Sequence, residues 1–219
     1  MPERQIVAMG GLPDDTLLDH VLDLAGGKRL LYVPTANREE SGRTVYWYDR
    51  LRDRAAMTHL SFFPWPPAKL RELALAQDVI LVGGGNTANA LAIWRTHGFD
   101  AILREAWEAG ALLTGWSAGM ICWFEHGVTD SFGPELAPME CLGILPGSAC
   151  PHYDGEVRRR PVYTGLVAGG FPAGLAADDD VALRFVGDEL REIVTTRAGA
   201  TAYRVGPDGE RPLVAKLLQ

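Results

Sequence analysis

The chain has 219 residues, of which 47% are apolar and 22% are charged, and its formal net charge is −7. This length suits one well-buried globular domain, and the acidic balance argues against nucleic acid and anionic membrane surfaces as partners. No apolar run approaches the roughly 18 residues of a membrane-spanning helix, and the start lacks the basic and apolar regions of a signal peptide.

Short apolar runs alternate with helical patterns through the first two-thirds of the chain. Runs typical of strands lie at 5–11, 29–36, 58–64, 78–85 and 111–116. Segments that predict helices lie at 13–27, 41–57, 68–77, 86–98, 99–110 and 118–127. This alternation predicts a mostly parallel sheet with helices on both faces.

The last third is richer in short β-type runs that are punctuated by turns such as GPDGE. These runs lie at 181–187, 191–199, 201–205 and 211–218. We expect them to form antiparallel strands added at a sheet edge. Because the sequence contains no internal repeat or linker, we predict a single domain over residues 1–219.

A serine between two glycines follows the predicted strand at 111–116. The segment GWSAG at 115–119 fits a G-x-S-x-G nucleophile elbow, in which small neighbours make room for a strained serine. The helix that begins near Ala118 would direct its N–H groups at an oxyanion. The same sequence also fits a plain turn in which Ser117 caps the next helix.

The glycine-rich loop GGGNT at 83–87 follows the preceding strand. It could hold a phosphate, although it lacks the G-x-G-x-x-G spacing and the lysine of a P-loop. It could instead supply an N–H group to an oxyanion hole opposite Ser117. A third interpretation is a strand-to-helix turn capped by Asn86 or Thr87.

A catalytic serine needs a base, and His152 is the best candidate among five histidines. His152 lies in the loop PHYDGE after a short apolar run, where it can approach the strand ends. The other four histidines lie in predicted helices or at the start of a strand: His20, His59, His97 and His126. The alternative is that His152 is a solvated loop residue.

The base in turn needs a carboxylate to orient it, and several are available. An α/β-hydrolase order would select Asp130, whereas Asp154 and Glu156 lie close to His152 in sequence. The run 178–180 holds three adjacent aspartates, which repel one another unless hydrogen bonds or a cation hold them. A solvated acidic turn is the alternative.

Together these segments resemble the peptidase E family of serine peptidases, family S51, which includes α-aspartyl dipeptidases and the more distant cyanophycinases. The matching segments are VGGGNT (82–87), GWSAG (115–119), PHYDGE (151–156) and GLAADDDVAL (174–183), and TDS at 129–131 is also similar. The resemblance implies a three-layer α/β fold of the flavodoxin-like and class I glutamine amidotransferase-like type. A glutaminase of that fold would require cysteine at position 117.

The resemblance also implies catalytic roles. Ser117 would be the nucleophile and His152 the base, and the N–H groups of Gly85 and Ala118 would form the oxyanion hole. The family's acid follows the histidine and is usually a glutamate, in a position that Asp179 matches most simply. Because aspartate is shorter, the choice among Asp178, Asp179 and Asp180 stays open, with Asp130 as a further alternative.

The function implied is a serine peptidase that hydrolyses short peptides, with N-terminal aspartate (Asp-X) as the expected preference. The family's aspartyl dipeptidases use an arginine in a segment similar to GEVR, which matches Arg158 here. Asn86 and Tyr153 are further candidates for substrate binding. For the triplet 158–160, the alternative is a solvated basic helix start.

Other functions remain open at this point: an S51-type exopeptidase of different or broader specificity (cyanophycinase-like), a non-catalytic anion-binding flavodoxin-like module, or an oligomeric scaffold. We expect a small peptide as partner, no nucleic acid or membrane, and a homodimer as the candidate assembly. No metal-ligand spacing occurs, and the resemblance implies neither metal nor cofactor. Three cysteines without C-x-x-C spacing predict reduced thiols in a cytoplasmic protein.

Overall fold

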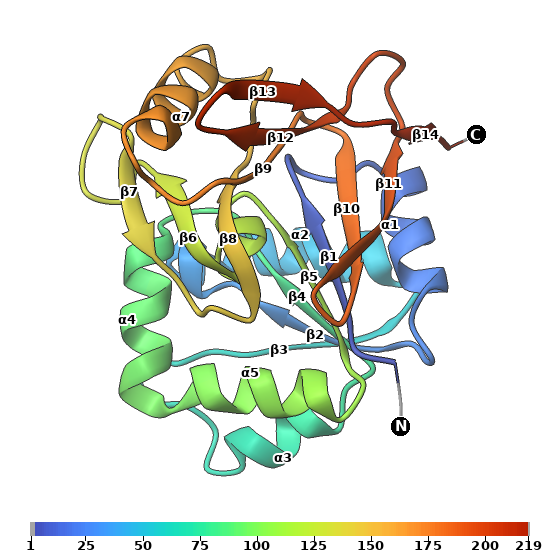
Figure 1. The fold of residues 1–219 in the computed structure, drawn as a ribbon. Helices are drawn as coiled ribbons and strands as arrows, with labels where there is room; N and C mark the ends of the chain where they lie inside the picture. Colours follow the sequence, from blue (N-terminus) through green and yellow to red (C-terminus); the bar gives the residue numbers. More distant parts are fainter. Residues whose placement is uncertain (1–2, 219) are drawn as a thin grey trace.

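The computed structural model describes residues 3–218, which form two β-sheets with helices around them (Figure 1). The described strands of the first sheet are, in spatial order, β14 (Lys216–Leu217), β11 (Glu189–Thr195), β10 (Val181–Val186), β1 (Gln5–Met9), β5 (Leu112–Trp116), β4 (Val79–Val82), β2 (Arg29–Val33) and β3 (Ala56–His59). The strands from β1 to β3 in this order are parallel, whereas β10 and β11 pair antiparallel at the side of β1. The predicted α/β class, with a mostly parallel sheet, is confirmed.

Helices cover both faces of the first sheet because side chains alternate along each strand. Val7 and Met9 of β1 pack with α1 (Asp15–Asp23) and α2 (Ser41–Leu51), whereas Ile6 and Ala8 face α4 (Thr87–His97) and α5 (Phe99–Glu108). The remaining helical segments are η1 (Thr35–Asn37), α3 (Leu70–Leu75), α6 (Ala118–Ile121) and α7 (Arg159–Ala168). Within residues 3–218, no helix has the length and apolar composition needed to cross a membrane.

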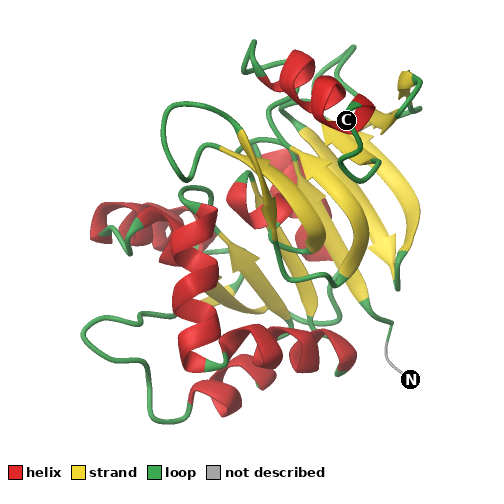
Figure 2. Cartoon of the chain, turned by 60° about the vertical axis from the view of Figure 1, so that its left-hand side comes forward, coloured by secondary structure: helices red, strands yellow, loops and turns green. Residues whose placement is uncertain are grey.

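A second sheet packs against the first. Its described strands are, in spatial order, β13 (Gly209–Pro212), β12 (Ala202–Gly206), β9 (Gly174–Ala177), β8 (Leu145–Cys150), β6 (Phe124–Thr129) and β7 (Ala137–Glu140). Leu145 and Ala149 of β8 join the core of the first sheet, while Cys150 packs with Tyr163 of α7. Helix α7 therefore lies over the second sheet, as Figures 1 and 2 show.

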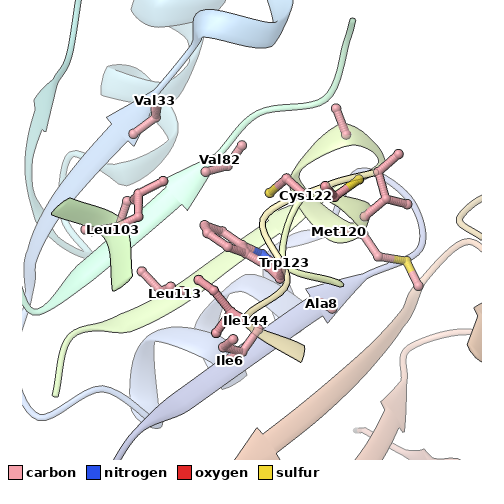
Figure 3. Packing of buried hydrophobic residues seen from close by; sticks show 14 of the residues in the cluster. Ile6, Ala8, Val33, Val82, Leu103, Leu113, Met120, Cys122, Trp123 and Ile144 are labelled. Carbon is pink, nitrogen blue, oxygen red and sulfur yellow. The ribbon is translucent and has the colours of Figure 1, made fainter. Parts of the chain in front are cut away.

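The turn that carries Ser117 is anchored by a buried segment directly after it. Met120 and Trp123 are completely buried. Figure 3 shows the ring of Trp123 among Val82, Leu113 and Ile144, which belong to the same core cluster. Replacing a buried tryptophan of this kind by alanine typically costs about 3–5 kcal/mol, so the elbow rests on a rigid base.

One sequence prediction of secondary structure is wrong. The helix predicted over 118–127 ends at Ile121, because the carbonyl groups of Cys122, Trp123 and Phe124 accept hydrogen bonds from residues 142–145. His126 therefore lies in strand β6. The predicted antiparallel pairing of the C-terminal strands is confirmed, but they are divided between two sheets: β10 and β11 join the first sheet, whereas β12 and β13 complete the second.

Candidate active site

Ser117 lies at a sharp turn between β5 and α6. Its φ of 56° and ψ of −111° are strained for a residue with a side chain, and its N–H donates to the Met9 carbonyl oxygen at 3.3 Å. A Cβ atom at Gly115 or at Gly119 would collide with the Val82 carbonyl oxygen of the neighbouring strand. Both glycines of the G-x-S-x-G segment are therefore required for the turn to pack against β4.

The hydroxyl of Ser117 does not cap the helix that follows. Within the described part of the chain, α6 receives no side-chain capping hydrogen bond at this position. The backbone carbonyl of Ser117 instead accepts the N–H groups of Met120 (2.9 Å) and Ile121 (3.1 Å). The hydroxyl is thus left for a role other than capping.

His152 follows β8, which pairs in parallel with β9. Because the carboxyl ends of adjacent parallel strands lie side by side, the loops after β8 and β9 meet. The His152 backbone has a φ of 52°, and its N–H donates to the Gly10 carbonyl oxygen at 3.2 Å, which ties the second sheet to the end of β1. Nδ1 of His152 lies 2.7 Å from Oδ1 of Asp179, in the loop after β9.

The carboxylate of Asp179 occupies space that only glycine leaves open. A Cβ atom at Gly11 would collide with its Oδ1, and one at Gly155 would collide with its Oδ2. No motif in the sequence predicts a role for these two glycines. Asp130, the alternative acid, is exposed after β6 and lies outside the cavity that His152 lines.

Each of the three adjacent aspartates makes a different contact. Oδ2 of Asp178 accepts the Thr201 N–H at 3.0 Å, Asp179 binds His152, and Oδ2 of Asp180 accepts from Nε of Arg197 at 2.9 Å. The acidic run is therefore an organised turn rather than a solvated one.

Arg197 holds this turn in place. Its Nη2 donates to Oδ2 of Asp154 (2.5 Å) and to the Asp179 carbonyl oxygen (3.0 Å), and Oδ1 of Asp154 accepts the Asp179 N–H (2.9 Å). Burial acts to raise the pKa of Asp154, but the hydrogen bonds from Asp179 and Arg197 outweigh it and lower the pKa below its ordinary value. The guanidinium thus fixes the backbone of Asp179 and leaves that carboxylate to His152.

Replacing Arg197 by methionine is expected to lower kcat about 10- to 100-fold with little change in KM, because a displaced Asp179 no longer orients the base. Arg197→Lys should recover part of the loss. Steady-state kinetics measure both effects, with Arg191→Met as the matched control because Arg191 is an arginine that pairs with Glu189 on the surface. A wild-type kcat for Arg197→Met, or no difference between the methionine and lysine variants, would contradict this role.

Asp178 carries a pH-dependent cost to folding. It is 2% exposed, and within residues 3–218 its Oδ1 has no hydrogen-bond partner. Burial raises the pKa of this carboxyl above its ordinary value, although the Thr201 N–H opposes the shift. At pH values between the unfolded and the folded pKa of Asp178, the folded chain binds more protons than the unfolded chain. The free energy of unfolding therefore falls as the pH rises through that window.

Asp178→Asn is therefore expected to raise the free energy of unfolding at pH 7 by about 1 kcal/mol, because an amide can still accept the Thr201 N–H without burying a charge. The advantage should shrink as the pH falls through the folded pKa and then below the unfolded pKa of about 3.9, where the wild-type carboxyl becomes protonated in both states. Urea unfolding of both proteins at several pH values measures the difference. A difference that is independent of pH would contradict the prediction.

The loops that carry Gly85 and Ala118 pack against each other at Ser117. Gly85 has a φ of 140°, and a Cβ atom there would collide with the Ala36 carbonyl oxygen, so glycine is required. A Cβ atom at Gly84 would lie 3.2 Å from the Cβ of Ser117. Ala118 is the first residue of α6, and its N–H therefore has no carbonyl partner in a preceding helical turn.

A cavity of ≈ 530 Å³ opens at these loops, and its lining includes Ser117, His152 and Gly85. This volume suits a small ligand. Arg38 and Arg43 also line the cavity, from the η1–α2 segment. Sequence reasoning missed both arginines because no motif surrounds them.

Two of the predicted substrate-binding residues have other partners. Asn86 lines the cavity, but its Nδ2 donates to the Ser131 carbonyl oxygen (2.9 Å) and its Oδ1 caps α4 by accepting the Asn89 N–H (2.8 Å). Tyr153 is 2% exposed, packs in the core beneath α7 and donates its hydroxyl to Glu210. The structure does not bring Tyr153 to the cavity.

The arginine triplet also lies outside the lining of this cavity. Nη1 of Arg158 pairs with Glu135 at 3.0 Å. Arg159 is buried and donates to Glu156 (2.7 Å), while the guanidinium of Arg160 lies 4.7 Å from the ring centre of Tyr153. Arg159 and Arg160 therefore make specific packed contacts, whereas Arg158 lies in an exposed ion pair, as expected for a solvated helix start.

Comparison with known proteins places this α/β fold among peptidases. The model of peptidase family S51 matches residues 7–193, and the chain belongs to that family. It is 45% identical over 212 residues to the uncharacterized peptidase YgaJ of Bacillus subtilis (strain 168), and the match covers 92% of each chain. It is 32% identical over 148 residues to the peptidase E of Shewanella denitrificans, and that match covers 63% of this chain and 62% of the relative. A crystal structure of a peptidase from an acI-B1 Actinobacterium has the same fold, with a TM-score of 0.71 at 19% identity over 97% of this chain and 95% of that one.

Proposed function

We propose that this peptidase is a serine peptidase that hydrolyses short peptides with a triad of Ser117, His152 and Asp179. The observation that carries the proposal is the 2.7 Å hydrogen bond between His152 Nδ1 and Asp179 Oδ1, behind the cavity that His152 and Ser117 both line. With Nδ1 engaged by the carboxylate, Nε2 is the ring nitrogen that can accept the serine proton. The strained backbone of Ser117 supports a nucleophile elbow.

In this mechanism the Ser117 hydroxyl attacks the carbonyl carbon of the scissile peptide bond while His152 takes its proton. The N–H groups of Gly85 and Ala118 stabilise the negative oxygen of the tetrahedral intermediate, and the imidazolium then donates its proton to the leaving amine. Water, deprotonated by the same histidine, hydrolyses the resulting ester and restores the serine. Asp179 stays ionised and stabilises the imidazolium at each step.

For the substrate we propose short peptides, with Asp-X dipeptides as the preferred class. The cavity lining holds two arginines and one carboxylate, that of Glu40, and this net positive charge supports an anionic substrate. The cavity of ≈ 530 Å³ suits a dipeptide better than a folded chain. The name peptidase E of the Shewanella denitrificans relative supports a peptide as the substrate.

A panel of Asp-Leu, Glu-Leu, Ala-Leu and longer peptides tests the substrate class. We expect kcat/KM for Asp-Leu to exceed that for Ala-Leu by at least about tenfold, since a charge-assisted hydrogen bond to the carboxylate is lost with alanine. Equal values would reject the aspartyl preference and favour a peptidase of broader specificity. No turnover of any peptide would contradict the peptidase mechanism itself.

A further inference from the structure

One wall of the cavity is formed by the η1–α2 segment and carries a net positive charge, because Arg38 and Arg43 line it together with the single carboxylate of Glu40. Arg38 follows η1 directly, Arg43 lies in the first turn of α2, and both line the cavity with Ser117. Nε of Arg43 lies 3.7 Å from Oε2 of Glu40, one turn back on the chain. Arg38, in contrast, forms no ion pair with any residue in the described range 3–218.

The acidic neighbour of Arg38 does not neutralise it. Oε1 of Glu39 accepts the Phe62 N–H at 2.7 Å, and its Oε2 accepts the hydroxyl of Ser61. These bonds hold the Glu39 carboxylate on the loop after β3, and Glu39 is not part of the cavity lining. The positive charge of Arg38 is therefore available to a ligand.

The backbone of this segment is held in an uncommon conformation. Arg38 and Glu39 have consecutive φ angles of 64° and 54°, in the left-handed region that residues with a side chain rarely adopt. The segment is fixed to the catalytic loops, because the Ala36 carbonyl oxygen accepts the Asn86 N–H at 2.8 Å. Thr35 accepts a hydrogen bond from the buried indole of Trp94 at 3.1 Å. Arg38 thus extends from a rigid base.

A second cavity of ≈ 330 Å³ adjoins the first and shares Ala36, Arg38 and Asn89 with it. The rest of its lining is mainly apolar, with Phe63 and Ile93 among the contributing side chains. A ligand that extends from Ser117 into this second cavity therefore passes the guanidinium of Arg38.

We propose that Arg38 is a specificity-determining residue that binds a carboxylate of the substrate. Arg38 thus has the role that the family resemblance implied for Arg158. An apolar side chain of the same substrate fills the second cavity beside Phe63 and Ile93. The proposal rests on the proposed peptidase function, since it concerns the ligand of that site. The carboxylate comes either from an acidic N-terminal residue or from the free C-terminus of a dipeptide.

Equilibrium binding to a Ser117→Ala protein tests this assignment without depending on turnover. Four peptides supply the charges separately: Asp-Leu, Ala-Leu, and the C-terminal amides of both. Isothermal titration gives the Kd of each for the Ser117→Ala protein and for the same protein carrying Arg38→Met or Arg158→Met. We expect Arg38→Met to weaken binding of the peptides that carry the recognised carboxylate about 10- to 100-fold, and to leave the others unchanged.

The pattern identifies the source of the carboxylate. A loss for both Asp peptides indicates the acidic side chain, whereas a loss for both free acids indicates the C-terminus. Equal Kd values with and without Arg38→Met, an equal loss for all four peptides, a larger loss for Arg158→Met, or no binding of any peptide would each overturn the proposal. Failure of the peptidase function itself appears separately, as an unreactive Ser117 in the unmutated protein.

Discussion

Replacing Ser117 by alanine is expected to lower kcat for peptide hydrolysis about 10⁴- to 10⁶-fold, because no other group can form the acyl intermediate. The oxyanion hole and substrate binding can still accelerate the reaction about 10³-fold over the uncatalysed rate in water. Steady-state kinetics on the best dipeptide of the panel measure the loss.

The control for this variant is its stability. The hydroxyl of Ser117 makes no capping bond within the described part of the chain, and the turn is held by Gly115, Gly119 and the buried Trp123. Ser117→Ala should therefore unfold at nearly the wild-type temperature. A stable Ser117→Ala protein that retains even one-tenth of the wild-type kcat would contradict the mechanism.

Asp179→Asn is expected to lower kcat about 10³- to 10⁴-fold with little change in KM. The amide cannot stabilise the imidazolium and favours the wrong tautomer of His152, the same reason that an equivalent change disables other serine triads. Kinetics on the same dipeptide measure the effect, and folding should change little because the isosteric side chain still fits between Gly11 and Gly155.

Asp130→Asn is the matched control, because Asp130 is an exposed aspartate outside the cavity lining. It should keep wild-type kinetics. A large loss of kcat for Asp130→Asn together with a small one for Asp179→Asn would show that the acid has been assigned to the wrong loop.

The parts of the site that could be predicted from the sequence are those that follow strands. The alternation of apolar runs and helices places the loops at 83–87 and 115–119 at the same sheet edge, and the structure brings these two loops into contact. The resemblance to peptidase E supplied the order of serine, histidine and acid. Among the three aspartates it pointed to Asp179, which is the one that binds His152.

The remaining features depend on contacts between segments that are distant in sequence. The second sheet forms because the backbone carbonyls after α6 pair with residues 142–145 rather than with the next helical turn. The roles of Gly11 and Gly155 follow only from the position of the Asp179 carboxylate between them. Arg38 carries no motif, and its place in the cavity depends on the fold of the η1 segment over the loop at Gly85.

Covalent labelling of Ser117 with a fluorophosphonate tests the central claim most directly. The reagent needs an activated serine and an oxyanion hole but no knowledge of the substrate. We predict one adduct on the native protein, located on Ser117 by mass spectrometry of the digested chain, that is lost on heat denaturation and in His152→Ala. Native protein that gives no adduct, or an adduct on another serine, would contradict the assignment of Ser117 as the nucleophile.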